Sequence, residues 1–166
     1  MSANAEAASP TSAKAARVII VAGVVAGVLD LAAACAFAWL RAGVNPVRVF
    51  HTIASGFLGA DAFAGGITTA MLGVALHFVI ATSAAAVYFL VSRRLEFLIK
   101  RPIAAGLLYG VMVYSFMNFV VLPLSAVARR PVPLSGRIYG ALIIMFFVGI
   151  PIALIVRRNE VSTTSR

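Results

Sequence analysis

Four long apolar runs, separated by short polar segments, dominate the hydropathy pattern of this chain. The runs extend over residues 18–40, 67–91, 103–124 and 138–156. Each is close to the ~20 residues that an α-helix needs to cross ~30 Å of hydrocarbon. Because lipid offers the backbone no hydrogen-bond partner, runs of this length fold as helices. The pattern therefore predicts an all-α fold, a bundle of four transmembrane helices.

A shorter helix is expected between the first and second runs. Asn45 and Pro46 are the residue types preferred at a helix N-cap and at the first helical position. On a helical wheel, one face of the following segment is apolar, and it is formed by Val47, Phe50, Ile53, Ala54 and Phe57. This predicts a short interfacial amphipathic helix. Two interpretations stay open: a surface connector, and a lid or re-entrant segment over a cavity.

The polar segments divide the chain into two tails and a membrane domain. Residues 1–16, rich in Ala and Ser, have little to bury and are expected to form a disordered tail. Residues 17–158 form the membrane domain, and residues 159–166 form a second tail. Lys and Arg near the span ends number nine on the side of the termini and five on the other side. The positive-inside rule then places both termini in the cytoplasm.

The composition supports a membrane protein and argues against a nucleic-acid-binding one. Hydrophobic residues make up 62% and charged residues 11% of the chain, whereas soluble domains have about 45–50% and about 25%. The net charge of +9 comes from Lys and Arg at the ends of the apolar runs. At these positions basic residues meet lipid headgroups. Membrane lipids are therefore the expected partners, and nucleic acid is not.

One carboxylate interrupts the first run. Asp30 would cost roughly 2.5–3.5 kcal/mol at the centre of a bilayer, so it needs a partner or a wet cavity. Gly23, Gly27 and Ala34 recur with it at spacings of three and four residues. Small residues at this spacing form the faces on which membrane helices pack closely. Asp30 is therefore expected to point into the bundle.

The second and third runs contain polar residues that are candidates to meet Asp30. His77 follows Gly73 on a stripe of small residues, at the same distance from the outer end of its run as Asp30 is from the end of the first. Asn118 lies on a line with Gly106 and Gly110. We expect Asp30, His77 and Asn118 to form an intramembrane polar cluster. It is either a hydrogen-bond network that holds the helices together or a proton- or ion-handling site.

Further glycines predict close helix packing in the last two spans. The segments GLLYG and GRIYG place Gly106 with Gly110, and Gly136 with Gly140, at GxxxG spacing. With Gly23, Gly27 and Gly73 they complete the expected packing positions. Prolines 123 and 151 lie inside apolar runs and predict kinks, since each leaves a backbone carbonyl without its helical donor.

The chemistry of a soluble enzyme is absent from the sequence. There is no P-loop, no dinucleotide-binding fingerprint, no CxxC and no HExxH. Asp30, His77 and Asn118 lack the soft or anionic ligands that a tight metal site prefers. A single histidine lies deep in a span, so haem ligation within one bundle is not expected. We therefore expect no catalytic activity, no metal and no cofactor.

Four segments carry a resemblance to a known family. They are GVLD, PVRVFHTIASGFLG, LGVALHF and MNFVVLPLS, and the similarity covers roughly residues 23–125. In these segments the chain resembles an uncharacterised family of small four-span bacterial inner-membrane proteins. The resemblance implies the same architecture and a bacterial inner membrane, and it transfers no activity.

Together these observations favour a non-catalytic structural or accessory membrane protein that associates with a second copy or with another membrane protein. The alternative is a small proton-linked transporter or channel, with Asp30 as the titrating group and His77 as its partner.

Overall fold

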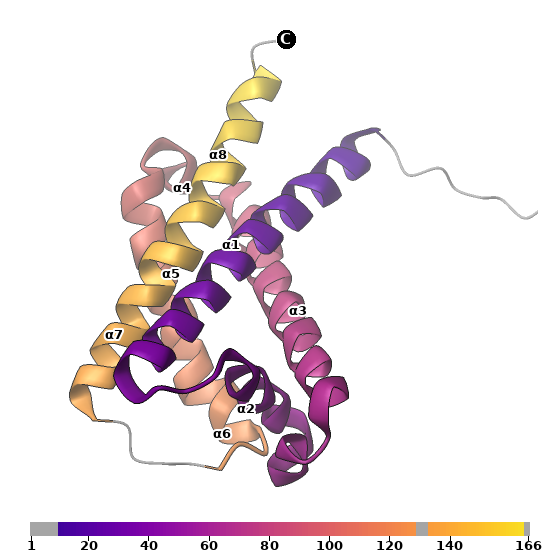
Figure 1. The fold of residues 1–166 in the computed structure, drawn as a ribbon. Coiled ribbons are helices and arrows are strands. Elements are labelled where there is room, and N and C mark those ends of the chain that lie inside the picture. Colours follow the sequence, from indigo (N-terminus) through magenta and orange to yellow (C-terminus); the bar gives the residue numbers. More distant parts are fainter. Residues whose placement is uncertain (1–9, 129–132, 165–166) are drawn as a thin grey trace, which may run out of the picture.

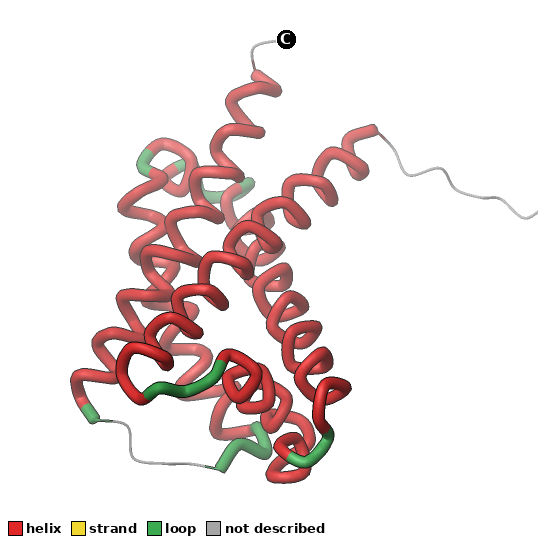
Figure 2. The backbone as a smooth tube through the Cα atoms, viewed as in Figure 1, coloured by secondary structure: helices red, strands yellow, loops and turns green. Residues whose placement is uncertain are grey.

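A computed structural model describes residues 10–128 and 133–164 of the chain. The described residues form helices and short loops without β-strands, as Figure 2 shows. Four helical segments are long and apolar enough to cross a membrane. They are Ser12–Ala42, Gly66–Ser92, Pro102–Leu124 and Leu134–Asn159. The predicted all-α fold with four candidate spans is therefore confirmed, and residues 1–9, 129–132 and 165–166 lie outside the described residues.

The first two spans are each a single continuous helix. Helix α1 (Pro10–Ala42) begins before the apolar run, so residues 10–16, which the composition assigns to a disordered tail, are helical. Alanine and lysine have high helix propensity, which explains this extension of the span. Helix α3 (Gly66–Ser92) is followed by a turn and by the short helix α4 (Phe97–Lys100).

The third span is interrupted near its end. Helix α5 (Pro102–Phe116) continues into a π-helical turn, η2 (Met117–Val121), and then into the short helix α6 (Leu122–Leu124). Pro123 lies two residues beyond the end of the π-helical turn. Because proline has no N–H to donate to the carbonyl four residues earlier, the regular helical ladder cannot continue through this point.

The fourth span has the same construction. Helix α7 (Leu134–Ile144) leads into the π-helical turn η3 (Met145–Gly149), and helix α8 (Ile150–Thr164) completes the span. Pro151 again follows the turn. The irregularities expected at the two prolines therefore take the form of π-helical turns just before each of them.

The predicted helix after the first span is present as α2 (Pro46–Leu58), followed by the 3₁₀ turn η1 (Gly59–Phe63). The side chain of Asn45 caps it and accepts a hydrogen bond from the backbone N–H of Val47 at 2.9 Å. The predicted apolar face is only partly the packed one. Ser55 is buried and Phe57 is 75% exposed, because the packed face of α2 is set by its contact with α3.

Helix α2 packs against the N-terminal part of α3. A Cβ atom on Gly73 of α3 would lie only 2.0 Å from the backbone oxygen of Phe50, and 3.3 Å from the nitrogen of Ala54. The chain after α6 also reaches this helix, since the N–H of Ala126 donates to the carbonyl of Gly56 at 3.0 Å. Helix α2 is thus held by contacts with α3 and with the chain after α6.

The four spans are not arranged as a symmetric bundle. Helix α1 packs against α3 on one side and against η3 and α8 on the other, and α5 packs mainly against η3 and α8. In Figure 1 the start of α1, α4 and the end of α8 lie at one end of the molecule, and α2 and α6 lie at the opposite end. The buried core gathers α1, α3, η3 and α8, with Tyr88, Ile152 and Val156 fully buried.

Candidate functional site: an aspartate and a histidine between two spans

The side chains of Asp30 and His77 approach each other between α1 and α3. The His77 ring nitrogen Nε2 lies 2.9 Å from the carbonyl oxygen of Gly27 and 3.9 Å from Oδ2 of Asp30. A carbonyl oxygen only accepts, so Nε2 carries a proton and donates a hydrogen bond to the carbonyl oxygen of Gly27. The short contact of the imidazole is therefore with the backbone of α1, and the carboxylate lies just beyond hydrogen-bond distance.

Glycines on α1 allow this approach. A Cβ atom on Gly23 would lie 2.5 Å from the Cα atom of Thr82, and one on Gly27 would lie 2.9 Å from the Phe78 ring. Distances below 3.0 Å are essentially never seen for real Cβ atoms. With hydrogen atoms at both glycines, α3 comes close enough for His77 to reach a backbone oxygen of α1. The glycines of α1 thus permit the close helix contact in which His77 makes its hydrogen bond.

The pair is largely, though not fully, enclosed. The side chain of His77 is 14% exposed and that of Asp30 is 19% exposed. Gly73, which contacts α2, precedes His77 by four residues, about one helical turn. Helix α2 therefore contacts α3 about one turn from His77. A partly enclosed acid and imidazole in this arrangement can form an ion pair or hold a proton, and the two groups attract each other when both are charged.

Asn118 does not join Asp30 and His77. It lies in the π-helical turn η2, and its side-chain N–H₂ donates to the carbonyl of Tyr114 in the same span at 2.8 Å. The expected three-residue cluster is thus not shown. The prediction assumed that three spans face a common centre, whereas α5 packs against η3 and α8.

The predicted packing glycines differ in how closely they are approached. A Cβ atom on Gly110 would lie 2.4 Å from the Cα atom of Met145, and one on Gly106 would lie 2.8 Å from the oxygen of Gly149. A Cβ atom on Gly140 would lie 3.4 Å from the Tyr114 ring, which is close to an ordinary contact. Gly136 is half-buried on α7.

Gly149 is a close-packing position that was not predicted from the sequence. A Cβ atom there would lie 2.0 Å from the oxygen of Gly106, so α5 and η3 touch backbone to backbone. No GxxxG partner marks Gly149 within its own span. Its position two residues before Pro151, where an irregular helix was expected, was the available indication in the sequence.

Two polar contacts between helices were also not predicted from the sequence. His51 Nε2 lies 2.8 Å from the carbonyl oxygen of Gly66 and fastens α2 to the start of α3. The hydroxyl of Tyr109 on α5 donates to the carbonyl of Ala84 on α3 at 2.7 Å. Tyr109 lies inside the GLLYG segment, from which only close packing at the two glycines was predicted.

No group of three or more His, Cys, Asp or Glu side chains gathers within the described residues in a way that could hold a metal ion.

Comparisons with known proteins do not extend this picture. No protein-family model, curated protein or solved structure matches the chain significantly.

Proposed function

We propose that this chain is a multi-pass protein of a bacterial inner membrane, with both termini in the cytoplasm, and that it acts as a non-catalytic structural or accessory subunit. The four apolar helices support membrane insertion. More Lys and Arg residues flank the spans on the side of the two termini than on the other side, which supports a cytoplasmic location of both termini. Its partners are lipids and either a second copy or another membrane protein.

The observation that carries the structural role is the hydrogen bond from His77 to Gly27. The proton on Nε2 is used to join α3 to the backbone of α1, at the place where glycines bring the two helices together. In this proposal Asp30, 3.9 Å away, adds an electrostatic attraction that favours the same helix pair. The polar groups then determine which helices pack, and they do no chemistry.

A double-mutant cycle tests this role. His77→Leu is expected to lower the free energy of unfolding in detergent by about 1 kcal/mol, since interhelical hydrogen bonds in membranes contribute ~0.6 and up to ~1.7 kcal/mol. Combining it with Asp30→Asn measures the coupling between the two side chains. Asp61→Asn, at an exposed position on η1, is the matched control for loss of one carboxylate. Additive effects of His77→Leu and Asp30→Asn would refute the role of the pair.

A specific observation keeps the transporter as a second candidate. The Asp30 carboxylate accepts no hydrogen bond from the described residues, and both members of the pair retain some exposure. In a transporter, Asp30 would bind the coupled proton, and His77 would respond to its charge. Proteoliposomes with an internal pH-sensitive dye distinguish the two functions. Proton flux that disappears in Asp30→Asn and persists in Asp61→Asn would establish transport, whereas the structural proposal expects no flux in any variant.

A further inference from the structure

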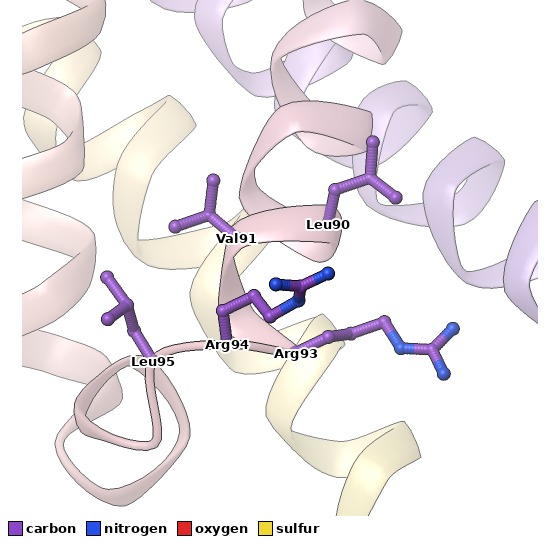
Figure 3. A pocket seen from close by; sticks show the side chains of 5 residues that line it. All are labelled: Leu90, Val91, Arg93, Arg94 and Leu95. Carbon is purple, nitrogen blue, oxygen red and sulfur yellow. The ribbon is translucent and has the colours of Figure 1, made fainter.

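A recess of about 800 Å³ lies at the end of α3 opposite to α2. Leu90, Val91 and Leu95 provide its apolar lining, and Arg93 and Arg94 provide its positive charge. Figure 3 shows both arginine side chains extending on the same side of α3 as Leu90. The recess therefore combines a hydrocarbon-like surface with two guanidinium groups from consecutive residues.

The charge of these two arginines is not neutralised by the described part of the protein. None of the described carboxylates forms an ion pair with Arg93 or Arg94. The nearest acidic residue along the chain, Glu96, is hydrogen-bonded to Lys100 instead. Guanidinium groups present a planar fork of N–H donors that binds phosphate oxygens in pairs. Two such groups on the lining of one recess favour a ligand that carries a phosphate.

The apolar surface continues from the recess along α3. Leu90 is 61% exposed, and Val87, one helical turn further into the span, is 51% exposed. A ligand that places its phosphate at Arg93 and Arg94 can thus lay a hydrocarbon chain along these side chains. A soluble phosphate compound would leave this apolar surface uncovered. The combination favours an amphiphile.

We propose that the recess binds one anionic phospholipid, with the phosphate held by Arg93 and Arg94 and an acyl chain against Leu90 and Val87. The proposal rests on the proposed placement of the chain in a membrane, and it is independent of the Asp30–His77 pair. The recess lies at the end of a candidate span, where headgroups meet water, and basic pockets at the cytoplasmic ends of membrane helices bind anionic headgroups.

Native mass spectrometry of the full chain, released from detergent with phosphatidylglycerol or phosphatidylcholine, tests the proposal. The wild type is expected to retain one phosphatidylglycerol at lipid concentrations that leave phosphatidylcholine unbound. The double variant R93Q/R94Q is expected to bind phosphatidylglycerol at least about tenfold more weakly, because it loses charge-assisted hydrogen bonds to the phosphate. The variant R101Q/R157Q loses the same charge at exposed residues that do not line the recess, and it is expected to behave like the wild type.

Several outcomes would overturn the site. Equal retention of both lipids would remove the selectivity for anionic headgroups, and equal weakening in both double variants would reduce the effect to general surface charge. Displacement of the lipid by millimolar inorganic phosphate would point to a soluble phosphate ligand. A dimer that appears only without lipid and is lost in R93Q/R94Q would assign the recess to a second copy. Since none of these variants touches His77, failure here leaves the proposed function to its own test.

Discussion

Replacing Gly23 by alanine perturbs the contact between α1 and α3 at the position that brings His77 to the backbone. The added Cβ atom would lie 2.5 Å from the Cα atom of Thr82 and 2.7 Å from its hydroxyl oxygen. Carbon atoms in contact prefer about 3.5–4.0 Å, so the helices have to separate by about 1 Å here. The obstacle is backbone, which cannot rotate away as a flexible side chain can.

This separation predicts the size of the effect. Moving α3 outward by about 1 Å would lengthen the 2.9 Å contact between His77 Nε2 and the Gly27 oxygen to about 3.9 Å, beyond hydrogen-bond distance. Overpacking costs about 1–3 kcal/mol, and the lost interhelical hydrogen bond adds about 0.6–1.7 kcal/mol. Gly23→Ala is therefore expected to destabilise the protein by about 2–5 kcal/mol.

Reversible unfolding in mixed detergent micelles, followed by circular dichroism, measures this change. Gly140→Ala is the matched control, because its added Cβ atom would lie 3.4 Å from the Tyr114 ring and requires little movement. The control is expected to stay within about 0.5 kcal/mol of the wild type, because its added methyl group makes an almost ordinary contact. Equal stability of Gly23→Ala and Gly140→Ala would refute the close approach of α1 and α3.

Three further predictions follow from other contacts. Tyr109→Phe removes the hydrogen bond to the carbonyl of Ala84, and it is expected to lower stability in the same unfolding assay by about 0.6–1.7 kcal/mol; no change would mean that the hydroxyl finds another partner. Gly149→Ala places a Cβ atom against the backbone of α5, and a loss of about 1–3 kcal/mol is expected; a stabilised variant would contradict the backbone contact. The hydrogen bond from Lys100 lowers the pKa of Glu96, so its stabilisation of α4 is present above the carboxyl's ordinary pKa and is lost as the pH falls through the lowered value. Hydrogen exchange of α4 as a function of pH should show this loss in the wild type and not in Glu96→Gln.

The fold was predictable from the sequence because span length and apolar composition depend on one physical requirement, the satisfaction of backbone hydrogen bonds in hydrocarbon. The N-cap at Asn45 was predictable for a similar reason, since a local rule decides it. The mutual approach of Asp30 and His77 followed from depth and small-residue spacing, both of which are local to hairpin neighbours. These features need no knowledge of how distant spans pack.

The rest depends on which helices are neighbours, and that information is spread over the whole chain. Asn118 was expected beside His77, yet α5 faces η3 and α8. The buried Ser55 and the exposed Phe57 show that the contact with α3 decides which face of α2 is covered. Hydropathy alone cannot rank these packing choices, because lipid and protein interior are equally apolar environments for a leucine or a phenylalanine.

The π-helical turn η3 makes the number of residues in the fourth span a determinant of its packing. Such a turn contains one more residue than an α-helical turn, so every side chain beyond it is rotated by about 100° relative to an uninterrupted helix. Ile152 and Val156, fully buried at present, owe their inward direction to that extra residue. A one-residue deletion within Met145–Gly149 would rotate both away from the core while hardly changing the hydrophobicity profile of the chain. An insertion or deletion in this span therefore rotates the part of the helix that follows it. Related sequences from other organisms should accordingly conserve the length of the span more strictly than its residues.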